Sequence, residues 1–280
     1  MTSDSSRDVA SPPRGVLRPA SAEPSDAHRR VLPAPALREL IEHYWGVSWS
    51  LSEPTLVETL PHPSVHLVFE SGAAGARAEV AGVPRGRFSR TLSGDGWVFG
   101  VKFRPAMFEP VLARDLATLT DRVVPLTQVF GAEGEAWARA TFTTPDFEAR
   151  TNLADAFLTT RLAGLRISGE CSATRDLVEH MAATHSLLRV ESAAERLGVD
   201  ERTLQRRFRR YVGVSPKWVI LRYRLHEAAE RLHSEQPPGL AQLAAELGYA
   251  DQAHFARDFS RVIGRTPREF AAAAAAQRRA

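Results

Sequence analysis

The chain has 280 residues, of which 44% are hydrophobic and 25% are charged, and its formal net charge is +3. These values are typical of a globular protein with about two domains. No stretch reaches the roughly 18 apolar residues of a membrane span, and the one cysteine, Cys171, excludes an internal disulfide and a Cys-based zinc site. Because no signal peptide is recognisable either, we expect a cytoplasmic protein that does not contact a membrane.

The N-terminal half changes character twice. Residues 1–30 are rich in Ser, Pro, Ala, Asp and Arg, which predicts a disordered tail. Leu37, Leu40, Ile41 and Tyr44 have helical spacing and predict a short amphipathic helix. Residues 107–163 also show helical patterns, most clearly over 147–162. Between these helical regions lie short runs of β-formers, punctuated by Pro or Gly, which predict an antiparallel meander: 55–60, 65–70, 78–83, 88–93 and 97–103.

We therefore expect a β-rich domain with flanking helices over 31–165. His62, His66 and Glu70 are four residues apart and could share a strand face as metal ligands. However, prolines interrupt the pattern and no third histidine follows at a suitable spacing. The simpler interpretation is a strand with Val65, Leu67 and Phe69 turned inward. We expect no metal and no cofactor.

Two further features of this domain leave alternatives open. The aromatic side chains of its strands either line a ligand pocket or simply form the core. They are Trp45, Trp49, Phe69, Trp97, Phe99 and Phe103. Arg104 either binds the carboxylate of a ligand or pairs with Asp121 or Glu109. No catalytic motif is present, so we do not expect an enzyme.

The last third is all helical and contains an internal repeat. Ala194, Leu197 and Gly198 recur 50 residues later, and Phe208, Gly213 and Pro216 recur 51 residues later. Each copy is a helix, a glycine turn and a second helix with a buried apolar stripe. That pattern predicts two helix-turn-helix units within an all-α domain over 172–275. The overall fold class is therefore α+β.

Local signals predict the ends of these helices. Asp200 and Asp251 are N-caps for the second helix of each unit. Ser215-Pro216 and Thr266-Pro267 each begin a further helix, and Thr266 with Glu269 has capping-box spacing. A helix over 216–233 joins the two units and would be about 27 Å long. It could hold two reading helices about one DNA turn apart, roughly 34 Å.

The charge distribution also suggests a polyanionic partner for the last third. Residues 171–280 contain 18 Lys and Arg against 13 Asp and Glu, a net charge of +5, whereas residues 1–170 have a net charge of −2. The first unit's second helix has a basic outer face. The second unit carries Asp258, which would repel a phosphate it faced, so we expect this unit to contribute less affinity.

Residues 194–270, and above all the stretch LAAELGYADQAHFARDFSRVIGRTPREF, resemble the tandem helix-turn-helix domain of AraC/XylS-type transcription regulators. This resemblance implies sequence-specific binding to double-stranded DNA and contact with RNA polymerase. By position, it assigns base reading to Arg202, Gln205, Arg206, Gln252, Ala253, His254 and Arg257. Arg209, Lys217, Arg222 and Arg261 are candidates for phosphate contacts, because Lys and Arg neutralise backbone charge.

The N-terminal domain resembles, less specifically, the β-rich domain that precedes this unit in some bacterial regulators. The matching segments are LPHPSVHLVFE, VFGVKFRPAMF and LTDRVVPL. In the wider family such a domain senses a small-molecule effector or mediates homodimerisation. Both alternatives stay open, as do the operator and the sign of regulation.

Overall fold

The computed structural model describes residues 16–18, 28–184 and 189–278. Most of the predicted disordered tail lies outside these ranges. Two strands include residues of the segment 1–30, β1 (Val16–Arg18) and β2 (His28–Val31), so the prediction of disorder is wrong for those residues. Both strands pair with β3 (Ile41–Thr59).

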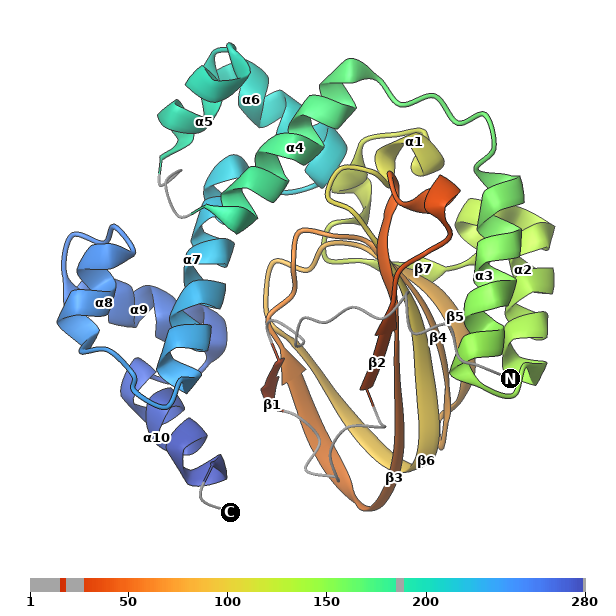
Figure 1. Ribbon diagram of the computed structural model, residues 1–280, viewed down its shortest axis with the longest axis horizontal. Helices are drawn as coiled ribbons and strands as arrows, with labels where there is room; N and C mark the ends of the chain where they lie inside the picture. The colour runs from red at the N-terminus through yellow and green to blue at the C-terminus, as the bar shows by residue number, and fades with distance from the viewer. Residues whose placement is uncertain (1–15, 19–27, 185–188, 279–280) are drawn as a thin grey trace.

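The described part of the N-terminal domain is built on a seven-stranded antiparallel sheet (Figure 1). Its order is β1-β3-β6-β4-β5-β7, and β2 also pairs with β3. The remaining strands are β4 (His66–Gly72), β5 (Gly75–Ala81), β6 (Phe88–Phe103) and β7 (Val123–Pro125). The long β3 and β6 pair along most of their length and form the backbone of the domain.

The predicted amphipathic helix around Tyr44 is wrong. A short 3-10 turn, η2 (Pro35–Leu37), is followed by β3. The pairing register shifts between Ile41 and His43, and this bulge lets Ile41 and Tyr44 both reach the core. Because a bulge breaks the two-residue alternation of a strand, the apolar residues acquire a spacing that imitates a helix.

The predicted strands over 88–93 and 97–103 are one strand, β6. The glycine-containing stretch between them does not end it. At Gly96 a Cβ atom would collide with the ring of Trp49, which lies across from it on β3. Gly96 therefore makes room for a tryptophan of the neighbouring strand while the strand continues.

Helices cover one face of the sheet (Figure 1). They are α2 (Thr127–Thr143) and α3 (Phe147–Arg161), and the second matches the predicted helix over 147–162. Phe69 on β4 meets Trp137 on α2, with ring centroids 4.7 Å apart. The aromatic set therefore belongs largely to the core. Shorter elements, α1 (Glu109–Leu112) and η3 (Leu116–Leu119), lie at the end of the sheet that faces the C-terminal helices.

The described residues of the C-terminal part contain helices and no strand, as predicted. After α4 (Gly169–Ala183), the first repeat comprises α5 (Val190–Leu197) and α6 (Glu201–Arg207), which continues as a π-helical turn, η4 (Phe208–Val212). The linker α7 (Pro216–His233) has the predicted bounds. The second repeat comprises α8 (Leu240–Glu246) and α9 (Gln252–Ile263), and α10 (Pro267–Gln277) follows. In Figure 1, α7 runs between the two repeats.

The hydrophobic core crosses the domain boundary. One cluster runs from the sheet through α4 into the first repeat, where it includes Leu204 and Phe208. A second cluster fills the second repeat and also takes in Leu60, which follows β3. Cys171 is fully buried within α4, where its Sγ lies 3.5 Å from the carbonyl of Ala106. No helix of the described residues is both long and apolar enough to cross a bilayer.

Candidate nucleic-acid interface

The first repeat has the geometry of a helix-turn-helix unit. α5 ends at Gly198, which adopts a left-handed φ of 64° that a residue with a Cβ atom rarely takes. The side chain of Asp200 then accepts a hydrogen bond of 2.7 Å from the amide of Thr203 and caps α6. Leu204, Phe208 and Tyr211 are buried along one side of the second helix. Packing on that side turns the opposite, basic side outward.

The second repeat repeats this construction. Gly248 makes the turn with a φ of 72°. Asp251 caps α9 by accepting a hydrogen bond of 2.7 Å from the amide of His254. Phe255 and Phe259 are fully buried against α8 and α10. The predicted capping box of Thr266 and Glu269 at the start of α10 is present.

The predicted base-reading side chains all lie on the exposed faces of the two reading helices, the second helix of each repeat. They are Arg202, Gln205 and Arg206 in the first repeat, and Gln252, Ala253, His254 and Arg257 in the second. In each repeat they occupy the first turns after the capping aspartate. Helix N-terminal turns are the part of a recognition helix that approaches base edges in the major groove.

Of the four predicted phosphate contacts, three are exposed and one is not. Arg209, Lys217 and Arg261 lie on the surface. Arg222 is only 2% exposed, and the expectation that it contacts a phosphate is contradicted by its position. Its guanidinium donates a hydrogen bond of 2.7 Å to the carbonyl of Arg85 in the N-terminal domain and stacks over the ring of Trp218. The position of Arg222 in the sequence gives no sign that the N-terminal domain covers this face of α7.

Asp258 has a role that its sequence position did not predict. Its carboxylate lies 2.7 Å from Nη2 of Arg261 and 3.7 Å from Nε2 of His254. It therefore pairs with two neighbouring side chains instead of pointing a free negative charge outward. Two of the second unit's predicted DNA-contacting side chains, His254 and Arg261, are therefore both paired with Asp258.

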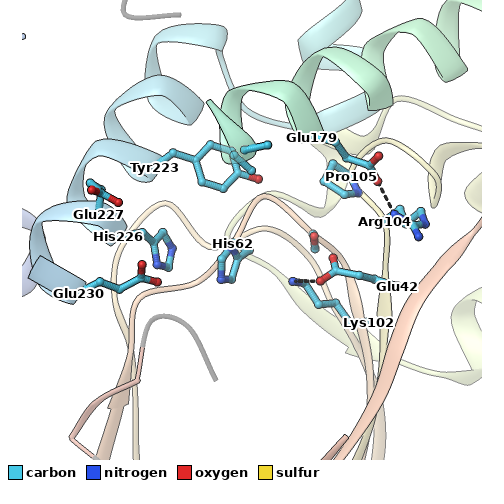
Figure 2. A pocket seen from close by; sticks show the side chains of 13 residues that line it. Glu42, His62, Lys102, Arg104, Pro105, Glu179, Tyr223, His226, Glu227 and Glu230 are labelled. Atoms are coloured by element: carbon cyan, nitrogen blue, oxygen red, sulfur yellow. Dashed lines mark hydrogen bonds and ion pairs between the residues drawn. The ribbon is translucent and has the colours of Figure 1, made fainter. Parts of the chain in front are cut away.

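The interface between the domains contains a cavity of about 340 Å³ (Figure 2). Glu42 and Lys102 of the sheet line one side, and Tyr223 and His226 of α7 line the other. The rings of His62 and His226 stack across the boundary with centroids 4.1 Å apart. Lys102 is bonded to Glu42 at 2.8 Å. Burial alone would raise the pKa of Glu42. The neighbouring Lys102 ammonium and the hydrogen bond from His43 outweigh burial and hold this pKa well below its usual range.

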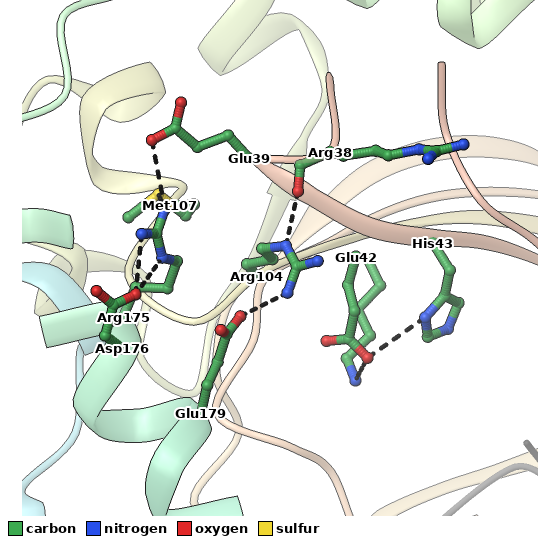
Figure 3. Close-up of polar contacts among 10 residues, drawn as sticks. Arg38, Glu39, Glu42, His43, Arg104, Met107, Arg175, Asp176 and Glu179 are labelled. Atoms are coloured by element: carbon green, nitrogen blue, oxygen red, sulfur yellow. Dashed lines mark hydrogen bonds and ion pairs between the residues drawn. The ribbon is translucent and has the colours of Figure 1, made fainter. Parts of the chain in front are cut away.

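Arg104 also lies at this boundary, and neither predicted partner is correct. Its Nη1 is 2.6 Å from Oε1 of Glu179 on α4, and its Nε donates to the carbonyl of Arg38 (Figure 3). The two carboxylates predicted for it are used by other arginines. Asp121 binds Arg85, and Glu109 binds Arg210.

The three residues weighed as metal ligands have other contacts. His66 accepts a hydrogen bond of 3.1 Å from Nε1 of Trp45, and burial lowers its pKa to about 3. Glu70 pairs with two arginines of the sheet, and His62 stacks on His226. Val65, Leu67 and Phe69 are buried, as the strand interpretation predicted. Among the residues with described positions, no cluster of three potential ligands is suited to a metal ion.

Comparisons with known proteins agree with the two-part architecture. Residues 29–125 match a domain of unknown function (DUF6597), and residues 193–273 match a helix-turn-helix domain. The HTH-type transcriptional activator RhaS of Escherichia fergusonii is 35% identical over 80 residues. Those residues are 28% of this chain, and the chain spans about 28% of the length of that relative.

Two solved structures are also similar. A transcriptional regulator with an AraC-type DNA-binding domain from Chromobacterium violaceum is 28% identical, with 38% of this chain and 96% of that chain covered and a TM-score of 0.35. ToxT from Vibrio cholerae is 11% identical, with 81% and 97% covered and a TM-score of 0.43. Residues 193–273 of this chain are therefore a helix-turn-helix domain, and they follow a segment, 29–125, that matches DUF6597.

Proposed function

We propose that this protein is a transcription regulator that binds a specific double-stranded DNA site through both helix-turn-helix units. The observation that carries this proposal is the repeated geometry: two capped reading helices, each with its apolar side buried and its polar side exposed, joined by one continuous helix. Two such helices can enter successive major grooves on one side of a duplex.

The side chains suit different bases in the two units. Arg202 and Arg206 can each donate two hydrogen bonds to guanine O6 and N7, and Gln205 can bind adenine through N6 and N7. In the second unit, Gln252, His254 and Arg257 supply donors, while Ala253 offers only a methyl contact. We therefore expect a guanine-containing block for the first unit and a weaker block for the second.

Phosphate contacts would fix this register. Arg209, Lys217 and Arg261 are exposed cations beside the reading helices. Each cation that neutralises a phosphate releases a counterion, so affinity falls as salt rises. We infer that the protein acts in the cytoplasm on promoter DNA and there recruits or obstructs RNA polymerase.

Control of DNA binding through the N-terminal domain is a second part of the proposal. The cavity between the domains supports control by a small-molecule effector, because its walls come from both domains and its volume of about 340 Å³ suits a small ligand. A homodimerisation module is the alternative. A thermal-shift screen separates them, because a ligand that binds the folded state raises the melting temperature.

The test of DNA binding is selection of bound sequences from a random duplex pool at about 150 mM salt. We expect two enriched blocks about one helical turn apart. Arg206→Ala should relax preference at one base position and cost about 1–3 kcal/mol, whereas Lys217→Ala should weaken binding to all sequences equally. Folded protein that enriches no motif, with or without a ligand found in the screen, would refute the proposal.

A further inference from the structure

The N-terminal domain touches both reading helices at equivalent places. Gly213 ends the reading helix of the first repeat and Gly264 ends that of the second, each with a left-handed φ. These two glycines are matching positions of the repeat, 51 residues apart. An N-terminal side chain lies against each one.

At the first unit, the hydroxyl of Thr120 donates a hydrogen bond of 2.6 Å to the carbonyl of Gly213. A Cβ atom on Gly213 would lie 3.2 Å from the carbonyl oxygen of Leu116. Nearby, Arg210 is bonded to the buried Glu109 at 2.8 Å. The end of the first reading helix is therefore held directly against the N-terminal domain.

At the second unit, Nη1 of Arg87 donates a hydrogen bond of 2.8 Å to the carbonyl of Ile263, the last residue of α9. The guanidinium occupies the space that a side chain on Gly264 would need. Glu58, whose side chain is 8% exposed, pairs with Arg87 at 3.1 Å and lies 3.9 Å from Arg265. Glu58 therefore holds Arg87 in place within the N-terminal domain and also lies near Arg265, which follows the end of the second reading helix.

The two contacting segments, 82–87 and 116–122, form one hydrogen-bonded unit, which we call the rim. Within the rim, the amide of Gly82 donates a hydrogen bond of 3.0 Å to the carbonyl of Arg122. The amide of Asp121 donates a hydrogen bond of 3.1 Å to the carbonyl of Val83. The carboxylate of Asp121 accepts from the amide of Arg85 at 2.6 Å. The rim also contacts the linker helix, because the carbonyl of Arg85 accepts from Trp218 and Arg222.

We propose that the rim sets the distance and rotation between the two reading helices, and that Arg87 and Thr120 are positioning residues for DNA spacing. The inference rests on the proposed function. One base pair of extra spacing moves a block by about 3.4 Å and turns it by about 35°. Two reading helices that are each held at one end by the same rim cannot follow that change, whereas two helices joined by α7 alone can bend to follow it.

The experiment uses the full chain and duplexes that carry the two selected blocks with the spacing changed by one base pair in either direction. For the wild type, we expect each change to reduce affinity at least about fivefold, the loss caused by one mismatched pair in a specific site. Arg87→Ala should reduce that penalty to less than about twofold while keeping the affinity for the first block alone. Arg87→Lys, which keeps a donor, should restore part of the penalty.

Arg77→Ala is the matched control. Arg77 is 32% exposed and Arg87 is 37% exposed, and Arg77 pairs with Glu70 and Glu79 inside the sheet, away from the reading helices. It should keep the wild-type spacing penalty. Thr120→Val, which removes the contact at the first unit with little change in volume, should relax spacing as Arg87→Ala does and serves if that variant does not fold.

The experiment distinguishes failure of this inference from failure of the proposed function. If folded Arg87→Ala and Thr120→Val keep the wild-type spacing penalty, the rim does not set spacing and the inference is overturned. If the wild type selects no pair of blocks at all, the proposed function fails and this inference falls with it.

Discussion

Arg222 permits a sharp test because its two possible roles predict different measurements. As a phosphate contact, its loss would lower the salt dependence of DNA binding. As a buried interdomain contact, its loss would lower the free energy of unfolding. The structure places it at 2% exposure with its guanidinium on the carbonyl of Arg85, so we expect the second result.

The expected destabilisation is the difference between one unfavourable and three favourable contributions of the Arg222 side chain. Burial lowers the pKa of Arg222 to about 10, so keeping it charged near neutral pH costs about 3 kcal/mol. Because its pKa is lowered on folding, this cost persists while the pH stays below about 10 and shrinks as the pH rises through that value. Two interactions offset this cost: a charge-assisted hydrogen bond contributes about 1.5–3 kcal/mol, and stacking on Trp218 contributes about 0.5–2 kcal/mol. Three buried methylenes contribute about 2.4 kcal/mol more.

Arg222→Ala removes all of these terms and should destabilise the protein by about 2–4 kcal/mol. Arg222→Met keeps the buried stem but not the charge, and should fall within about 1 kcal/mol of the wild type. Chemical denaturation, followed by fluorescence, measures both. Neither variant should change the salt slope of DNA binding.

Lys217→Ala is the matched comparison, since Lys217 lies five residues earlier on the same helix and is exposed. It should leave the unfolding free energy within about 0.5 kcal/mol and flatten the salt slope by about 0.9. A flattened slope for folded Arg222→Met would show that Arg222 reaches DNA in the complex, and the structural reasoning would be wrong.

Three other predictions concern stability and reactivity. Gly264→Ala should lower the free energy of unfolding by about 1–3 kcal/mol, because φ is 81° and Arg87 fills the space that the new methyl group needs. Gly239→Ala, at a position with an ordinary φ and open surroundings, should lower it by less than about 1 kcal/mol, and thermal unfolding compares the two variants. Thr266→Ala should lose about 0.5–2 kcal/mol with the capping box, and restoration by Thr266→Ser in the same assay would support the cap. Burial raises the pKa of Cys171 to about 12, so a maleimide at pH 8 should label the native thiol about a thousandfold more slowly than the unfolded one; equal rates would contradict this burial.

The features that the sequence predicted well are those set by neighbouring residues. Asp200, Asp251 and Thr266 cap helices through hydrogen bonds that span three residues, so their roles are visible in a short window. The stripe of Phe255 and Phe259 follows from helical periodicity alone. The bounds of α7 follow from Ser215-Pro216 at one end.

The features that it did not predict depend on partners far along the chain. Tyr44 lies in a strand because β6 pairs with it, and no local signal shows that pairing or its bulge. Arg104 meets Glu179, 75 residues away, and Arg222 meets a loop 137 residues away. Arg87 and Thr120 were not singled out at all, because nothing in their own neighbourhood distinguishes them from other surface polar residues.

The way the rim holds the reading helices has a consequence for how the proposed regulator would evolve. The N-terminal domain holds these helices through main-chain carbonyls at their ends, at Gly213 and Ile263. The exposed positions such as Arg202, Gln205 and Arg206 take no part in those contacts. Substitutions there should change stability by no more than about 0.5 kcal/mol. Under the proposed function, new operator preferences would therefore arise by single mutations, while the geometry of the two units and its dependence on the N-terminal domain would be inherited unchanged.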